Sequence, residues 1–219
     1  MRNILITGSS RGIGEAILLN LKEKGFNCIG PTRNELDISS IDSIKRYVNS
    51  LNVKVDCLIN CAGINILGDI NQITEENTSK MINSNLVGPL FLIQAVSENM
   101  KKKKYGKIIN ISSIWGIRSK EYRTLYSMTK FGINGLTKSL ARELGEYNIL
   151  VNSIAPGYVN TEMTKKNVPE EEQVKIKENI PLKRFAEPRE IAELVSFLIS
   201  DNNTYITGQT IIIDGGFLA

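Results

Sequence analysis

The stretch Thr7-Gly8-Ser9-Ser10-Arg11-Gly12-Ile13-Gly14 follows a short apolar run and precedes an amphipathic segment. Its glycines let the backbone turn tightly and approach a bound group closely. The free N–H groups and the positive dipole end of a helix that begins here would suit a pyrophosphate. A glycine-rich turn can be purely structural, but its position between a predicted strand and a predicted helix favours a dinucleotide-binding turn.

Short apolar runs alternate with amphipathic patterns along the whole chain. Unbroken apolar runs suit parallel strands buried on both faces; they lie at Ile4–Thr7, Asn27–Gly30, Cys57–Asn60, Lys107–Ile111, Leu150–Ala155 and Thr210–Asp214. Helices are predicted near Ile13–Lys24, Ser40–Leu51, Glu75–Met100, Arg123–Glu146 and Arg189–Ser200. This alternation is typical of an α/β fold with one doubly wound, Rossmann-like parallel sheet. A chain of 219 residues without a linker or repeat fits one domain, residues 1–219.

The composition is that of an ordinary soluble protein, with 42% hydrophobic and 23% charged residues. The net charge is +4, and its local excess lies at lysines 101–104 and 107. A solvated helix end explains these lysines better than a nucleic-acid surface, because no aromatic platform accompanies them. No apolar run approaches the roughly 18 residues of a membrane span. We therefore expect neither a nucleic acid nor a membrane as a partner.

Histidine is absent, which excludes histidine-based nucleophile triads and imidazole metal ligands. The three cysteines, Cys28, Cys57 and Cys61, lie in or just after predicted strands. We interpret them as small buried hydrophobic side chains and predict no metal site, since a zinc ion would lack further ligands. An odd number of cysteines without an export signal indicates a reducing cytoplasm.

A second chemical feature lies downstream, where Tyr126 and Lys130 are four residues apart and Ser113 precedes Tyr126 by thirteen. Four residues make about one helical turn, so the phenol and the ammonium would share a face. A neighbouring cation is expected to lower the pKa of the phenol toward the working range of an acid or base. Such pairs also occur by chance on solvated helices, but beside a dinucleotide site this one favours proton exchange with an alcohol or carbonyl.

These motifs, in this order, resemble those of the short-chain dehydrogenase/reductase family. Asn60-Cys-Ala-Gly63 is similar to the family's Asn-Asn-Ala-Gly, with Cys61 as a departure. Further similar segments are Asn83-Ser-Asn-Leu-Val-Gly88, Pro156-Gly157 with Thr161, and the C-terminal stretch Tyr205–Gly216. That last stretch resembles the 3-oxoacyl-acyl-carrier-protein reductase branch.

The resemblance implies a role for each residue of the site. Tyr126 would be the acid or base, Ser113 would hydrogen-bond the reacting oxygen, and Lys130 would also hold the nicotinamide ribose. Asn85 would anchor a water that links Lys130 to solvent. The cofactor contacts implied in the same way are Gly8, Ser10, Arg11, Gly12, Ile13, Gly14, Arg33, Asp37, Ile38, Asn60, Ala62, Gly63, Tyr126, Lys130, Pro156, Gly157, Val159 and Thr161.

One departure from the family concerns the edge of the sheet. Only three residues separate Arg33 from Asp37-Ile38, whereas a parallel crossover needs about a dozen or more. The usual third strand therefore cannot form, and we predict a six-stranded sheet in which Asp37 reaches the adenine directly. This deletion also explains the short chain.

The same region bears on the choice of cofactor. An acidic residue at the end of the second strand usually accepts the ribose hydroxyls of NAD, whereas a 2′-phosphate needs cations. Here the sequence is Gly30-Pro-Thr-Arg33, with Arg11 as a second candidate clamp. We therefore predict NADP(H) in preference to NAD(H). The alternative is that Arg33 stacks on the adenine or points to solvent.

The substrate is less closely defined than the reaction. Residues 158–185 are predicted to form a substrate lid, although their apolar members could equally be ordinary packing. The loop residues Trp115, Arg118, Lys120, Tyr122 and Arg123 could meet an anionic substrate or carrier, but we favour solvated charges. We expect a small-molecule carbonyl or alcohol substrate.

By resemblance, the substrate is a 3-oxoacyl thioester and the assembly a homotetramer or homodimer. Lys104 fits the family's basic contact to the carrier protein, but Tyr147 replaces the second such contact. A sugar or another small ketone is therefore an alternative substrate. A non-catalytic NADP-binding sensor or scaffold is a further alternative, which the complete set of Ser113, Tyr126, Lys130 and Asn85 disfavours.

Overall fold

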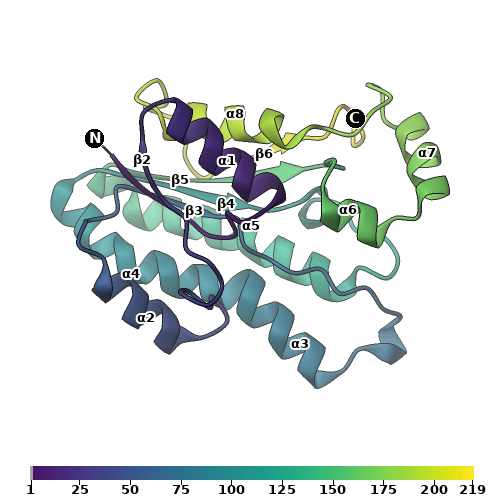
Figure 1. Ribbon diagram of the computed structural model, residues 1–219, viewed down its shortest axis with the longest axis horizontal. Coiled ribbons are helices and arrows are strands. Elements are labelled where there is room, and N and C mark those ends of the chain that lie inside the picture. Colours follow the sequence, from purple (N-terminus) through teal and green to yellow (C-terminus); the bar gives the residue numbers. More distant parts are fainter. Residues whose placement is uncertain (1) are drawn as a thin grey trace.

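The computed structural model describes residues 2–219 and contains one parallel six-stranded sheet in the order β2-β1-β3-β4-β5-β6 (Figure 1). The strands are β1 Asn3–Ile6, β2 Asn27–Ile29, β3 Cys57–Asn60, β4 Gly106–Ile111, β5 Ile149–Pro156 and β6 Thr210–Ile213. The predicted fold class and number of strands are confirmed. The order reverses between β1 and β3, because the chain leaves β1 for one edge and returns to build the other.

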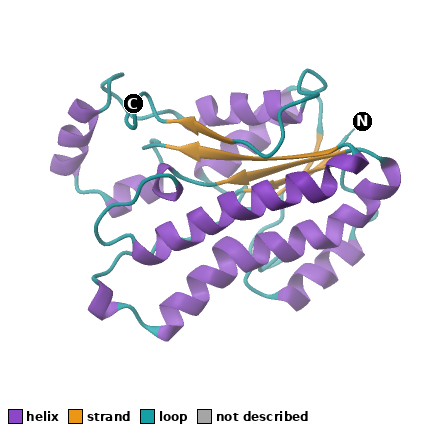
Figure 2. Ribbon diagram, turned by 180° about the vertical axis from the view of Figure 1, so that it is seen from behind, coloured by secondary structure: helices purple, strands orange, loops and turns teal. Residues whose placement is uncertain are grey.

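Helices cover both faces of this sheet (Figures 1 and 2). Helices α1 and α8 lie on one face, and α2, α4 and α5 lie on the other, with α6 and α7 beyond the end of the strands. The bounds are α1 Gly12–Glu23, α2 Ile41–Ser50, α3 Glu75–Ile82, α4 Gly88–Lys103, α5 Thr124–Leu144, α6 Glu162–Asn167, α7 Glu170–Asn179 and α8 Pro188–Ile199. Within residues 2–219, no helix is both long and apolar enough to cross a membrane.

Alternation along β1 divides the core into two layers. Ile4 and Ile6 pack with the apolar faces of α1 and α8, whereas Leu5 packs with the helices of the opposite face. All three side chains are fully buried. Because each such side chain contributes about 1.5–3 kcal/mol on burial, an unbroken apolar strand is stable only between two helical layers.

The shortened edge after β2 closes with a compact turn. The Glu35 carboxylate accepts hydrogen bonds from the backbone N–H and the hydroxyl of Thr32, at 2.7 and 2.8 Å. Leu36 then enters the core. The carbonyl of Ile38 passes so close to α4 that a Cβ added to Gly88 would lie 2.1 Å from it. The chain thus packs directly on α4.

The single helix predicted over Glu75–Met100 is interrupted. A π-turn at Asn83–Val87 separates α3 from α4. Pro89 follows in the first turn of α4, and a proline clashes with the carbonyl four residues earlier, here that of Asn85. The wider π-turn accommodates this proline, and π-turns are frequent at functional sites.

Residues 158–185 fold as α6 and α7 with a small apolar cluster of their own. Val168, Ile176, Ile180 and Phe185 are buried together, with Tyr158 and Phe217 packed against them. These four apolar residues of the predicted lid therefore pack together, whereas Met163 and Leu182 are exposed, and the function of this segment as a lid stays a prediction.

We predict that Gly88→Ala destabilises the protein by about 1–3 kcal/mol, because the new Cβ would overlap the carbonyl of Ile38. Gly135→Ala on α5 is the matched control, since a Cβ there meets nothing within 4 Å. It should stabilise the protein by up to about 1 kcal/mol through helix propensity. Urea denaturation measures both changes, and equal stability of the two variants would contradict the close approach of the shortened edge to α4.

Candidate active site

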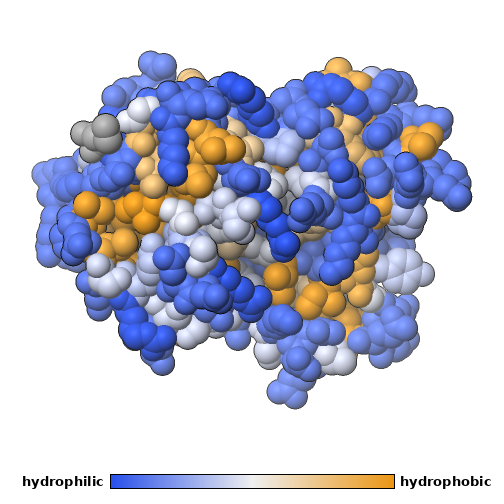
Figure 3. Space-filling view, in the orientation of Figure 1, coloured by the Kyte–Doolittle hydropathy of each residue, from blue (hydrophilic) through white to orange (hydrophobic). Residues whose placement is uncertain are grey.

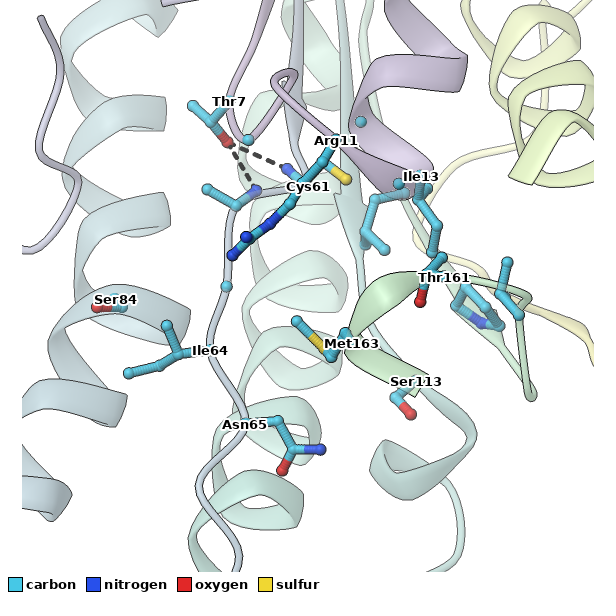
Figure 4. A pocket seen from close by; sticks show the side chains of 18 of the residues that line it. Thr7, Arg11, Ile13, Cys61, Ile64, Asn65, Ser84, Ser113, Thr161 and Met163 are labelled. Atoms are coloured by element: carbon cyan, nitrogen blue, oxygen red, sulfur yellow. Dashed lines mark hydrogen bonds between the residues drawn. The ribbon is translucent and has the colours of Figure 1, made fainter. Parts of the chain in front are cut away.

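A cavity of about 360 Å³ lies at the carboxyl ends of β1, β3, β4 and β5. In open α/β sheets, ligands bind at this edge, where the strand order reverses. The space-filling view shows the surface hollowed between the body of the molecule and the α6–α7 side (Figure 3). Figure 4 shows side chains from both sides of the cavity, with Arg11 and Met163 near its middle.

The glycine-rich turn is joined to the end of β3 by Thr7. Its hydroxyl accepts hydrogen bonds from the N–H groups of Cys61 and Ala62, both at 3.1 Å (Figure 4). Gly8 has φ +69°, and a Cβ at this position would lie 2.7 Å from Cα of Ala62. Only glycine allows these two turns to approach so closely.

The start of α1 fits a dinucleotide pyrophosphate. Gly12 has φ +60°, and a Cβ on Gly14 would lie 2.1 Å from the carbonyl oxygen of Gly8. Arg11, the N-cap residue, caps none of the helix N–H groups with its side chain. These N–H groups therefore remain available to an anion at the positive end of the helix. The residues present suit a bound nicotinamide dinucleotide.

Helix α5 carries Tyr126 and Lys130 into the same cavity. The Lys130 ammonium donates a hydrogen bond of 2.8 Å to the carbonyl of Ile111, at the end of β4, and lies 5.5 Å from the centre of the Tyr126 ring. Ser113 follows β4 and lines the cavity together with Tyr126. The strand end and the helix thus bring the three residues together across a gap of thirteen residues in sequence.

The electrostatics of this group differ from the sequence-based prediction. Burial raises the pKa of Tyr126 to about 12, and the Ser113 hydrogen bond and the charge of Arg123 only partly oppose this. Burial also lowers the pKa of Lys130 to about 8. The prediction that the pKa of Tyr126 is lowered is wrong for the protein alone, since burial has the larger effect. The phenol therefore holds its proton at neutral pH.

Two predicted asparagines lie outside the cavity lining. The Asn85 side chain accepts a hydrogen bond from the Ile64 N–H at 2.9 Å and donates one to the Ile64 carbonyl at 2.8 Å. A Cβ on Gly63 would lie 3.2 Å from Asn85 Oδ1 and 3.8 Å from Lys130 Nζ. Asn85 thus anchors the backbone beside Lys130.

The side chain of the other asparagine makes a structural contact. The amide of Asn60 donates a hydrogen bond of 2.9 Å to Asn110 Oδ1 in the core. Asn110 in turn donates to the Thr137 hydroxyl at 3.0 Å. The Asn60 side chain therefore faces β4 and α5 rather than the cavity.

The end of β2 presents one free cation and one engaged carboxylate. Arg33 is exposed and lines the cavity, and it forms no ion pair with any residue from 2 to 219. Asp37 accepts hydrogen bonds from the hydroxyl and N–H of Ser39, at 2.7 and 3.0 Å. These bonds, with help from the charge of Arg33, lower the pKa of Asp37. Arg11 pairs with Glu162 of α6 at 3.7 Å, across the mouth of the cavity.

The remaining predicted residues are assembled as expected, although their roles stay predictions. Those lining the cavity are Gly8, Ser10, Arg11, Gly12, Ile13, Gly14, Arg33, Asp37, Ile38, Ala62, Gly63, Ser113, Tyr126, Lys130, Pro156, Gly157, Val159 and Thr161. Sequence reasoning missed Asn65, whose Oδ1 is buried without a partner in the described chain. Its position just after Asn60–Gly63 was the available signal.

Comparison with known proteins agrees with this geometry. A family model described as Enoyl-(Acyl carrier protein) reductase matches residues 29–218. The 3-oxoacyl-[acyl-carrier-protein] reductase FabG of Thermotoga maritima is 37% identical over 238 residues, covering 98% of this chain and 96% of the relative. The chain belongs to the short-chain dehydrogenase/reductase family of oxidoreductases. The FabG of Vibrio harveyi is 34% identical, covering 97% of this chain and 95% of its own.

Solved structures of the family superpose over almost the whole chain. A 4-hydroxyisoleucine dehydrogenase complexed with NADH has a TM-score of 0.94 and 32% identity, covering 99% of this chain and 98% of that one. ElxO with NADP bound has a TM-score of 0.92 and 29% identity, with the same coverage. Relatives of this short-chain dehydrogenase/reductase therefore bind either nicotinamide dinucleotide.

The low pKa of Lys130 predicts a pH-dependent stability. Below about pH 8 both the folded and unfolded states hold this proton, and above it only the unfolded state does, since lysine ordinarily titrates near 10.4. The contribution of Lys130 to the free energy of unfolding therefore rises with pH. Relative to Lys130→Met, the unmodified protein should gain up to about 1.4 kcal/mol per pH unit between about pH 8 and 9.

Urea denaturation of ligand-free protein measures this gain. Burial raises the pKa of the Cys57 and Cys61 thiols to about 12, which lowers the stability of both proteins at alkaline pH, so the difference between the two pH profiles is the quantity to compare. Lys138→Met, at an exposed position of α5, is the matched control and should leave the pH profile unchanged. Parallel pH profiles for Lys130→Met and the unmodified protein would show that burial does not lower the pKa of Lys130.

Proposed function

We propose that this chain is an NADP(H)-dependent oxidoreductase that interconverts a carbonyl and a secondary alcohol. The observation that carries the proposal is the placement of Ser113, Tyr126 and Lys130 in one cavity with the glycine-rich turn. A phenol and a serine hydroxyl directed at one point can polarise a carbonyl oxygen from two sides.

The residues divide the work as follows. A bound nicotinamide cofactor supplies or removes the hydride. In reduction, Tyr126 donates its proton to the carbonyl oxygen, and its raised pKa keeps that proton in place until charge develops. Ser113 donates a hydrogen bond to the same oxygen. Lys130 holds the ribose hydroxyls and, with a pKa of about 8, can return a proton to the phenolate.

The preference for NADP(H) rests on Arg33. Its exposed guanidinium lines the cavity at the end of β2, and arginine binds a phosphate through paired charge-assisted hydrogen bonds. Asp37 does not decide the choice, because both hydrogen bonds from Ser39 end on Oδ1 of its carboxylate.

The first substrate class to test is a 3-oxoacyl thioester, because the FabG relatives are named for it. A second class is a sugar or another small ketone, which would meet the aromatic wall of the cavity. Trp115 and Tyr158 line the cavity and meet edge to face at 6.1 Å between ring centres. Phe185 stacks on Tyr158 at 5.4 Å.

We further propose a cytoplasmic homotetramer or homodimer. Apolar side chains are exposed on α4 and α5, at Leu90, Met128 and Phe131, and on β6, at Ile212. Exposed apolar residues on a pair of helices and on the edge strand of the sheet favour contact with another subunit. All three cysteines are free thiols, as suits a reducing compartment.

Tyr126→Phe tests the acid/base assignment. The variant should keep its affinity for NADPH but lose about 10²- to 10⁴-fold in kcat, because the proton donor is removed while the ring remains. Turnover is followed by cofactor absorbance with acetoacetyl thioesters, diketones and keto sugars. Tyr122→Phe, at an exposed position nearby, should leave turnover unchanged. Unaltered kcat in Tyr126→Phe would refute the assignment.

Arg33→Ala tests the cofactor preference. Loss of a charge-assisted phosphate contact should weaken NADPH binding about 10- to 100-fold and change NADH binding less than about threefold. Fluorescence titration with both cofactors measures this. Arg46→Ala, an exposed arginine on α2, serves as the control for a general loss of positive charge. Equal affinities of the unmodified protein for NADH and NADPH, unaltered by Arg33→Ala, would exclude the preference.

A further inference from the structure

Arg123 is a buried cation without a counter-charge. Its side chain lies just before α5, and the residue is only 7% exposed. Within the described chain its guanidinium takes part in no hydrogen bond and no ion pair, and the residue lines the cavity. This corrects the sequence-based interpretation, which favoured a solvated charge. Burying an unpaired cation is costly, so the protein keeps it here against its own stability.

Neighbouring charges do not neutralise Arg123. The carboxylate of Glu172 on α7 forms its ion pair with Lys120 of the same loop, at 3.0 Å, and not with Arg123. The charge of Arg123 instead acts on two phenols, because it lowers the pKa of both Tyr126 and Tyr158 against the effect of burial. Tyr126 and Tyr158 line the same cavity as Arg123.

The spacing to Tyr126 sets the reach of this cation. The two residues are three apart, Arg123 is the N-cap residue of the helix that carries Tyr126, and both line the cavity. A molecule whose carbonyl oxygen meets Tyr126 and Ser113 would bring a group two or three bonds away toward Arg123. An anion there would supply the missing counter-charge.

We propose that Arg123 binds a substrate carboxylate, so that the substrate is a short keto acid or hydroxy acid with its reacting carbon two or three bonds from the carboxylate. The inference rests on the proposed carbonyl–alcohol reaction. It narrows the substrate from ketones in general to small carboxylates and sets it apart from a 3-oxoacyl thioester, whose acyl carbon carries no negative charge. A guanidinium suits this ligand because it can bind both carboxylate oxygens.

Matched acids and esters test the charge alone. With NADPH, acetoacetate and levulinate should be reduced with kcat/KM at least about tenfold above their methyl esters. Arg123→Gln should lower kcat/KM for both acids about 10- to 100-fold, mainly through KM, and leave the esters within about threefold. Arg123→Lys should recover part of the loss. Arg118→Gln, which removes an exposed cation of the same loop, should change neither.

Two further measurements separate this inference from the proposed reaction. Calorimetric titration of levulinate into the protein with NADP⁺ should show binding that Arg123→Gln weakens about 10- to 100-fold, whether or not any ketone is turned over. The melting temperature of ligand-free Arg123→Gln should equal or exceed that of the unmodified protein, since an unpaired buried cation is removed. A structural role would lower it.

The outcomes that overturn the inference are specific. Reduction of esters as readily as acids, with no change in Arg123→Gln, would reject the carboxylate while leaving the proposed reaction intact. Failure of levulinate to bind the NADP⁺ complex would reject the carboxylate site, whether or not the protein reduces ketones. Binding of levulinate without turnover of any ketone would retain Arg123 as a carboxylate site and reject the proposed reaction.

Discussion

The hydroxyl of Thr7 accepts hydrogen bonds from the N–H groups of Cys61 and Ala62, and the cavity depends on this contact. It holds the ends of β1 and β3 together at the point where the strand order reverses. The missing side chains of Gly8 and Gly14 allow the closest approach, and any Cβ at these positions would overlap backbone atoms. This junction positions the glycine-rich turn at the start of α1. It also positions residues 61–63, which follow β3.

Two buried cations give the cavity its electrostatic character. Lys130 is engaged by a neutral carbonyl and has a pKa lowered to about 8, and Arg123 has no partner in the described residues. Both positions cost stability, as is common where function needs a preorganised charge. The raised pKa of Tyr126 belongs to the same low-dielectric environment. It favours a neutral phenol, which is the form that a proton donor requires.

The short segment after β2 lies at the edge of the sheet, away from Ser113, Tyr126 and Lys130. Because Ile38 packs on Gly88, the segment after β2 joins α4, and the same α4 begins beyond the π-turn that carries Asn85. The loop after β2 packs directly on α4, and this contact closes the edge of the sheet without a further strand. The hydrogen bonds of Asn85 to Ile64 remain available to position the backbone beside Lys130.

Local patterns in the chain determined the six strands to within a residue or two, the glycine-rich turn, and the sharing of one helix face by Tyr126 and Lys130. These features depend on periodicity and on short motifs, which act over a few residues. The helices α6 and α7 escaped prediction because they are short and rich in charge, with little apolar periodicity. Long-range contacts could not be read in this way. That Lys130 meets the carbonyl of Ile111, that Asn60 faces Asn110, and that Arg123 is buried without a counter-charge depend on how distant segments converge at the end of the sheet. Burial and hydrogen-bond partners, and with them the pKa of each group, exist only once those segments are packed together.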